Sequence, residues 1–129
     1  MFHPKHHVGG LRTIAQWARG ISRNEEFGIF DTADRLEVAD EAGNLFGVLR
    51  GENGRICTLG AWDEQIAFFP CTPANEAWHG YPLFPVNKGL SKSKPPPSRP
   101  VPLAVFRRMT VAGLLKEDET KRLARGRHL

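Results

Sequence analysis

Two features are scarce in this 129-residue chain: it has only two cysteines and no long apolar run. No window approaches about 18 consecutive apolar residues, and the first residues lack the apolar region of a secretory signal. We therefore expect neither a transmembrane helix nor a signal peptide, and we expect a cytoplasmic protein. Cys57 and Cys71 have no Cys-x2-Cys partner, which predicts reduced, mostly buried thiols rather than a redox pair.

Motifs that bind metals or phosphates are also missing. His3, His6 and His7 cluster near the N-terminus without a fourth ligand, so we interpret them as adventitious metal binders and expect no cofactor. No Gly-x4-Gly-Lys-Ser/Thr sequence is present, which excludes a P-loop.

Charge is distributed unevenly along the chain. Residues 1–87 hold 7 basic and 11 acidic residues, a net charge of −4, whereas residues 88–129 hold 11 basic and 3 acidic residues, a net charge of +8. The formal charge of +4 therefore comes from the C-terminal third. A basic segment of this kind accelerates encounters with acidic proteins or nucleic acids without identifying either.

Hydrophobic periodicity predicts one N-terminal helix followed by strands. Leu11, Ile14, Ala18 and Ile21 recur at helical spacing, which predicts a helix over residues 11–21. Short runs rich in β-branched and aromatic residues then predict five antiparallel strands. They are Phe27–Phe30, Arg35–Asp40, Asn44–Arg50, Arg55–Leu59 and Gln65–Phe69, with Asn53-Gly54 as a type I′ hairpin turn. Residues 44–49 and 66–69 are apolar on both faces of their predicted strands, so we expect both faces to be covered, one by the helix and the other by the aromatic loop that follows.

The C-terminal half begins with a loop and a linker. Four prolines in residues 70–86 predict an irregular loop, neither a helix nor a central strand. A basic, proline-rich linker follows over residues 87–101.

Two helices are predicted after the linker. Pro102 suits a helix start, Leu103, Phe106 and Met109 recur on one face, and Gly113 is expected at the C-terminal end. A second helix begins at Glu117. The segment from residue 109 to 119, with Leu123, resembles the short C-terminal (SHOCT-like) hairpins appended to many bacterial proteins. This resemblance implies a helical hairpin and no function.

The predicted fold class is α+β: an N-terminal helix packed on a curved antiparallel meander of about five strands, then a Pro-rich basic linker and a C-terminal helical hairpin. The expected divisions are a flexible His-containing N-terminus (1–10), an α+β core domain (11–86), the linker (87–101) and the hairpin (102–129).

The candidate partner-binding residues are aromatic or basic. Rings framed by prolines suit an anchor patch for a protein partner, and equally a cover over the sheet. The set comprises Trp78, His79, Tyr81, Phe84, Arg107 and Arg108. We therefore expect a non-enzymatic interaction module, either an immunity-type protein or an accessory subunit. It would bind another protein, with one that has an acidic surface as a candidate, through the aromatic loop 78–86 and the basic hairpin.

Two alternatives remain open at this point. A factor that binds RNA or single-stranded nucleic acid would contact phosphates through Lys88, Lys92, Lys94, Arg99, Lys121, Arg122, Arg125 and Arg127. A cysteine hydrolase would use Cys71 and His79, although no nucleophile signature surrounds either cysteine. Neither a membrane nor a small-molecule substrate is indicated.

Overall fold

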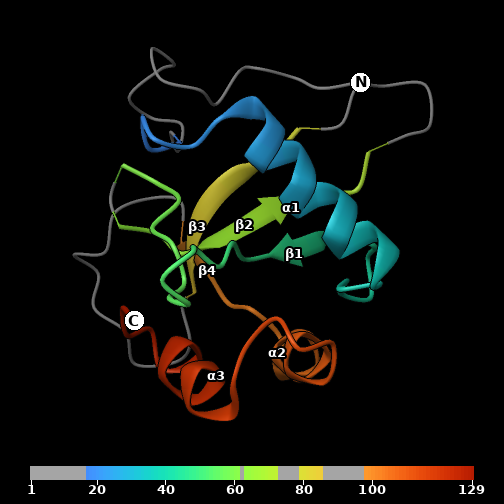
Figure 1. Cartoon of the computed structure of the whole chain (residues 1–129). Coiled ribbons are helices and arrows are strands. Elements are labelled where there is room, and N and C mark those ends of the chain that lie inside the picture. Colours follow the sequence, from blue (N-terminus) through green and yellow to red (C-terminus); the bar gives the residue numbers. More distant parts are fainter. Residues whose placement is uncertain (1–16, 62, 73–78, 86–97) are drawn as a thin grey trace.

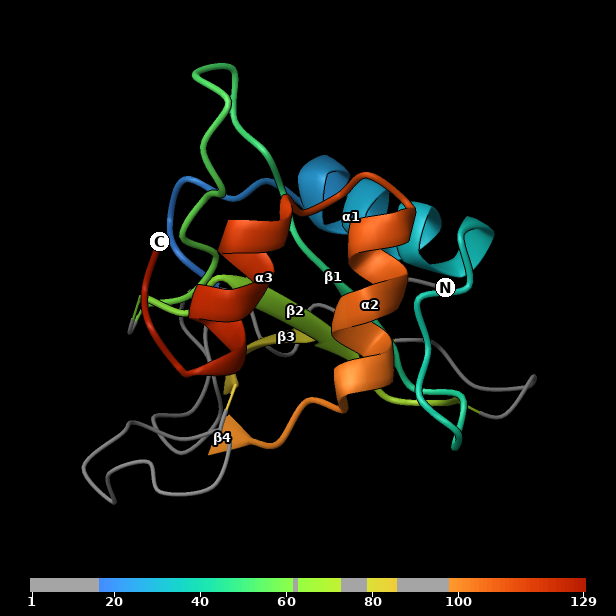
Figure 2. The same cartoon turned by 90° about the horizontal axis from the view of Figure 1, so that it is seen from below.

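The chain folds into a small sheet between two helical layers (Figures 1 and 2). The computed structural model describes residues 17–61, 63–72, 79–85 and 98–129. Figure 1 shows the helix of residues 23–35 on one side of the sheet and the helices of residues 103–111 and 117–124 on the other. In chain order the elements are α1 (Arg23–Arg35), β1 (Leu45–Gly47), β2 (Ile66–Phe69), β3 (Tyr81–Pro85), β4 (Ser98–Arg99), α2 (Leu103–Val111) and α3 (Glu117–Ala124).

The sheet has the order β1-β2-β3-β4. β1, β2 and β3 are antiparallel, with Phe46 opposite Phe68 and Ala67 opposite Pro82. The two-residue β4 is parallel to β3. Helices with a three-stranded antiparallel sheet confirm the α+β class.

The predicted five-strand meander is wrong in three of its strands. Phe27–Phe30 lies inside α1. Arg35–Asp40 contributes only a bridge from Ala39 to Leu45, and Arg55–Leu59 only a bridge from Ile56 to Arg50. The other two runs contain β1 and β2. Propensity favoured strands in the failed segments, but only the runs that are apolar on both faces became paired strands.

The first described helix begins twelve residues later than predicted. Residues 11–16 of the predicted helix lie outside the described residues, and residues 17–21 are not helical, because Trp17 pairs with Gly60 in a β-bridge. α1 begins instead after Ser22, whose side chain accepts a hydrogen bond from the Glu25 amide at 3.1 Å. Glu25 in turn accepts from the Ser22 amide at 3.0 Å, which completes a capping box.

Prolines enter the sheet in β3, contrary to the prediction that this segment forms no central strand. Pro82 lies opposite Ala67 of β2, and Pro85 lies opposite Arg99 of β4. β4 covers only the end of β3, opposite Phe84 and Pro85. The first part of β3 is therefore hydrogen-bonded to a neighbouring strand on one side only. A proline whose nitrogen points to the unpaired side removes no hydrogen bond between strands.

The turn at Asn53-Gly54 is located correctly but differs in type. Gly54 has φ +80°, whereas Asn53 is not among the residues with positive φ. The Gly54 amide donates to the Gly51 carbonyl at 3.0 Å, and Gly51 donates to Arg55 at 2.8 Å. This is the pattern of a three-residue hairpin loop that ends in a left-handed glycine, rather than a type I′ turn.

Side chains of β2 alternate between two cores. Ile66 and Phe68 belong to the core beneath α2 and α3, whereas Ala67 and Phe69 belong to the core beneath α1. On the α1 side, the buried Trp17 indole donates to the Gly80 carbonyl at 3.2 Å. The strands are thus covered on both faces, as predicted.

The cover of the second face is the helical hairpin, not the aromatic loop. Val105, Phe106 and Met109 of α2 and Leu123 of α3 pack in the same core as Phe46 and Phe68 of the sheet. Figure 2 shows α2 and α3 lying across this face. The loop prediction failed because residues 81–85 of that loop are a strand of the sheet themselves.

The predicted starts of the two C-terminal helices are confirmed, and the C-cap of the first is Ala112, one residue before the predicted C-cap Gly113. Pro102 is the N-cap of α2, Gly113 adopts φ +81° directly after its C-cap, and α3 begins at Glu117. Residues 98 and 99, at the end of the predicted linker, form β4, and residues 87–97 lie outside the described residues. None of the described helices has the length and apolar character needed to cross a membrane.

Candidate functional site

The outer face of α2 exposes large apolar side chains beside arginines. At about 100° per residue, Leu103, Arg107 and Val111 follow one another along one side of the helix. Val111 is 86% exposed and Leu103 is 61% exposed, whereas Val105 and Met109 on the opposite side are fully buried. Ala104 and Arg108 are exposed on the same outer side. We call Leu103, Ala104, Arg107, Arg108 and Val111 the α2 face.

A shallow cavity adjoins the N-terminal end of the α2 face. It has a volume of about 480 Å³ and lies between α2 and the turn that follows Ala39. Ala104 and Pro102 line its helical side, and Asp40 and Glu41 line the other side. Asp40 fixes this turn, because its carboxylate accepts from the Asn44 amide at 2.9 Å. The cavity therefore gives the α2 face a preformed concave edge.

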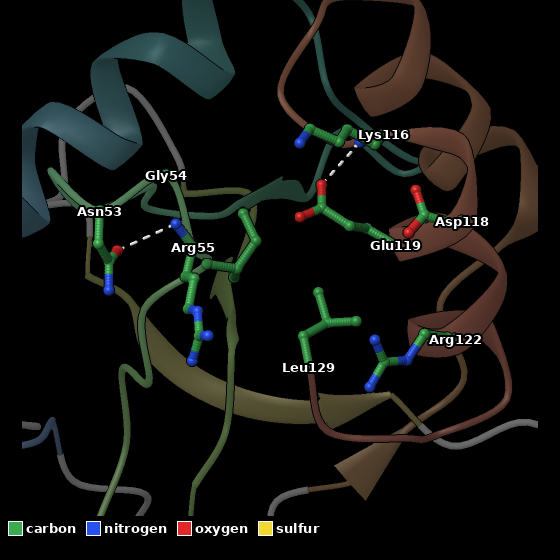
Figure 3. Close-up of a pocket in the computed structure, with 9 residues that line it drawn as sticks. Asn53, Gly54, Arg55, Lys116, Asp118, Glu119, Arg122 and Leu129 are labelled. Carbon is green, nitrogen blue, oxygen red and sulfur yellow. Dashed lines mark hydrogen bonds between the residues drawn. The ribbon is translucent and has the colours of Figure 1, made fainter.

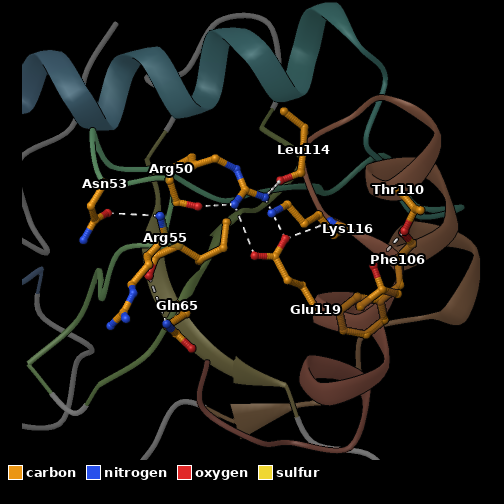
Figure 4. Close-up of polar contacts among 12 residues, drawn as sticks. Arg50, Asn53, Arg55, Gln65, Phe106, Thr110, Leu114, Lys116 and Glu119 are labelled. Carbon is orange, nitrogen blue, oxygen red and sulfur yellow. Dashed lines mark hydrogen bonds and ion pairs between the residues drawn. The ribbon is translucent and has the colours of Figure 1, made fainter.

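Arg50 holds the hairpin layer against the rest of the fold (Figure 4). Its guanidinium donates to both carboxylate oxygens of Glu119, at 2.7 and 3.1 Å, and to the Leu114 carbonyl at 3.0 Å. The hydrogen bond from Arg50 is the main reason that the pKa of Glu119 lies below its usual range. The two helices are joined by a hydrogen bond between the hydroxyls of Thr110 and Thr120 at 2.7 Å. The α2 face therefore sits on a fixed support.

The aromatic residues predicted to bind a partner lie largely inside the fold. Trp78 is outside the described residues. Tyr81 is half-buried with its ring centroid 5.3 Å from that of Phe68, and Phe84 is only 9% exposed. His79 is also half-buried. Of the predicted set, Arg107 and Arg108 are the two exposed residues in the part of the chain that the structure describes.

The basic residues of the nucleic-acid hypothesis divide in the same way. Lys88, Lys92 and Lys94, together with the Arg99 side chain, lie outside the description. The remaining four are exposed, and they are Lys121, Arg122, Arg125 and Arg127. α3 thus presents positive charge to solvent, while its first turn carries Glu117, Asp118 and Glu119.

The two cysteines are free, but the prediction that both are mostly buried is wrong. Cys71 is exposed and Cys57 is partly exposed. The Cys71 amide donates to the Asn44 side chain at 2.8 Å. Among the described residues, no hydrogen bond joins the Cys71 thiol to His79, which is the contact that a Cys-His nucleophile needs.

No metal-ligand cluster occurs among the described residues. They contain no group of three or more His, Cys, Asp or Glu side chains placed to hold an ion. His3, His6 and His7 lie outside the described residues. The exposed His128 shares a hydrogen bond with Thr58 at 3.2 Å.

Among the residues that the structure describes, two carboxylates are buried, and neither was anticipated. Glu26 of α1 is fully buried, and burial raises its pKa to about 8, although Arg23 acts in the opposite direction. Glu64 is 1% exposed and its carboxylate lies against Gly60. A single sequence gives no periodic signal for a buried acid, because charged residues are almost always placed on the surface.

Sequence reasoning also missed the apolar part of the α2 face. Leu103 was assigned to the buried face with Phe106 and Met109, but the buried face is centred on Val105, Phe106 and Met109. The available signal was the spacing of Leu103 and Val111 around Arg107, which places an apolar pair on the side opposite the core.

Comparisons with family models, curated proteins and solved structures gave no match for this chain.

Proposed function

We propose that this protein is a non-enzymatic interaction module that binds a partner protein through the α2 face. The observation that supports it most directly is the pairing of Leu103 and Val111, both highly exposed, on a helix whose inner side is completely buried. Scattered single apolar residues on a surface need no explanation, but an aligned pair over two helical turns is a ready contact stripe. Burying both side chains contributes about 3 to 5 kcal/mol to binding before the costs of association.

The partner is expected to carry acidic groups next to apolar ones. Arg107 lies between Leu103 and Val111, and Arg108 lies beside it. Arginine is favoured at interfaces because its planar fork binds carboxylates in a bidentate manner. The cavity beside Ala104 offers space for one apolar side chain of the partner. An amphipathic segment with carboxylates on its flank matches this surface.

Site-specific photo-crosslinking in the native host tests the proposal. A photoreactive phenylalanine analogue replaces Val111 in one variant and Phe27 in a control variant. Phe27 is a suitable control because it is 51% exposed but lies on α1, on the opposite side of the sheet. We expect one defined protein adduct from position 111 and none of the same mass from position 27.

Once the crosslinked partner has been identified and purified, titration calorimetry measures how much each side chain of the α2 face contributes to the binding affinity. We expect Val111→Asp and Arg107→Glu each to weaken binding about tenfold or more, and Phe27→Asp to change it less than twofold. Equal adducts from both positions, or unchanged affinity of the Val111→Asp variant, would refute the proposal.

The nucleic-acid hypothesis is the second candidate, supported by the four exposed basic side chains of α3 and the residues after it, Lys121, Arg122, Arg125 and Arg127. Filter binding of a single-stranded oligonucleotide at two salt concentrations tests it, because phosphate contacts weaken steeply as salt rises. Affinity that is undetectable at low salt, or unchanged at high salt, would reject this candidate. The hydrolase hypothesis has no comparable support, since the Cys71 thiol is not hydrogen-bonded to His79.

A further inference from the structure

A second cavity lies apart from the α2 face, between the loop at residues 51–55 and the start of α3 (Figure 3). Its volume is about 550 Å³, which is in the range of pockets that hold small molecules. Its walls come from segments far apart in the sequence, including Arg55, Lys116, Arg122 and Leu129. Such a cavity is fixed only if the segments that form it are held together.

Arg50 holds these two walls in place. It reaches from the base of the hairpin loop to Glu119 and to the Leu114 carbonyl, so the loop and the start of α3 are bound to one guanidinium (Figure 4). Glu119 also accepts a hydrogen bond from the Lys116 amide at 2.8 Å. The loop itself is closed by the hydrogen bond from the Arg55 amide to the Asn53 side chain at 3.0 Å. The cavity is therefore preformed.

The side chains that line the cavity leave an excess of positive charge. Glu119 is paired with Arg50, so its charge is already compensated. Of the other ionised side chains on the walls, Arg55, Lys116 and Arg122 are basic and Asp118 is acidic. Among the described residues, none of the three basic side chains has an ion-pair partner, and Arg122 donates only one hydrogen bond, to the His128 carbonyl at 3.3 Å. A concave site with this excess attracts anions.

Geometry and chemistry favour phosphate over a simple carboxylate. Figure 3 shows Arg55 and Arg122 on opposite sides of Leu129, with Lys116 at another edge of the cavity. Guanidinium forks from two walls suit a group with three acceptor oxygens, which accepts hydrogen bonds from several directions at once. Ile56 and Leu129 add apolar contact, and Asp118 offers an acceptor for a ligand hydroxyl.

We propose that this cavity binds the phosphate group of a small phosphate ester of about nucleotide size, with Arg55 and Arg122 as its main ligands. Asp118 then faces the polar body of the ester, and Ile56 its apolar part. This site is separate from the α2 face and does not depend on the partner proposed above.

Titration calorimetry with the full chain tests the site, using inorganic phosphate, adenosine 5′-monophosphate and a 12-nucleotide single strand as probes. We expect saturable binding of the mononucleotide. Arg55→Gln and Arg122→Gln should each weaken it about tenfold or more, since each removes charged hydrogen bonds. Arg35→Gln is the control, because Arg35 is exposed at the end of α1, on the other side of the sheet, and does not line the cavity. We expect it to change the affinity less than twofold.

Each probe separates one source of phosphate from the others. Binding of inorganic phosphate with the same dependence on both arginines supports an anion site that needs no base or sugar. The proposal is overturned if neither phosphate nor the mononucleotide binds saturably, or if Arg35→Gln weakens binding as much as Arg122→Gln. It is also overturned if only the single strand binds, since the site would then belong to a nucleic-acid surface. Circular dichroism of both arginine variants checks that they remain folded, which their exposed positions lead us to expect.

Discussion

Phe106 tests whether the C-terminal hairpin is part of the same cooperative unit as the sheet. It is fully buried and packs in the core that contains Phe46 and Phe68 of the sheet. Truncation of a buried phenylalanine to alanine costs about 3 to 5 kcal/mol, since it removes apolar contact and leaves a cavity. With a urea dependence of about 2 kcal/mol per molar, the Phe106→Ala variant should unfold at a urea concentration roughly 2 M lower.

Trp17 reports this change from the other side of the sheet. It is 1% exposed in the core beneath α1, so its fluorescence follows a part of the molecule that does not belong to the Phe106 core. The measurement uses chains with Trp62→Phe and Trp78→Phe, which leave Trp17 as the only tryptophan. We expect the transitions from fluorescence and from far-ultraviolet circular dichroism to shift together, as two-state unfolding requires.

The matched control for this experiment is Val111→Ala in the same helix. Val111 is 86% exposed, so its truncation should change the free energy of unfolding by less than about 0.5 kcal/mol. If Phe106→Ala lowers the helical signal but leaves the Trp17 transition where it was, the hairpin unfolds separately. The assignment of one shared core would then be wrong.

Three further substitutions test individual contacts, each by urea denaturation. The folded-state pKa of Glu26, about 8, lies above its unfolded value, so stability should fall as the pH rises from about 4.5 to 8. Glu26→Gln should flatten this slope and stabilise the protein on the order of 1 to 3 kcal/mol at pH 7; an unchanged slope contradicts burial of the acid. Glu119 has a lowered pKa, so its contribution is complete above its unfolded value and is lost as the pH falls through the folded one. Glu119→Gln should therefore cost about 1 kcal/mol at pH 7 and progressively less in acid, and a pH-independent cost would argue against the ion pair. Gly47→Ala should cost about 1 to 3 kcal/mol, because the new Cβ would lie 2.5 Å from a methyl group of Ile29. When Gly47→Ala is combined with Ile29→Ala, the loss of stability should be smaller than the sum of the losses from the two single substitutions. Strict additivity of the two losses would show that the two residues do not touch.

The helices show which local signals a single sequence supplies. α2 and α3 were predicted at their observed positions because their ends carry residues with one strong conformational preference, Pro102 at the start and Gly113 after the end. The start of α1 carries an equally local signal, Ser22 followed three residues later by Glu25, which forms the capping box. That signal was overlooked because Phe27 and its apolar neighbours have strand propensity. In α1 those residues project from different sides of the helix, so Ile29 is buried while Phe27 is half exposed.

Because both faces of the strands are apolar, the sequence correctly predicts that both faces of the sheet are covered. It contains no information on which segments of the chain cover them. Residues 102–129 follow a proline-rich stretch, and nothing in their spacing ties them to Phe46 or Phe68, since contacts between distant segments depend on tertiary packing.

The position of the helical hairpin on the sheet also limits which of its surfaces can bind another molecule. Once Val105, Phe106, Met109 and Leu123 are used to cover the sheet, the hairpin can meet other molecules only through its outer side. That side holds the α2 face and one wall of the cavity bounded by Arg55 and Arg122. In the described part of the C-terminal third, Arg107 and Arg108 thus lie beside apolar residues on the outer side of α2, whereas Lys116 and Arg122 line the cavity. The first arrangement suits a protein surface and the second suits a small anion, which is why we assign them different ligands.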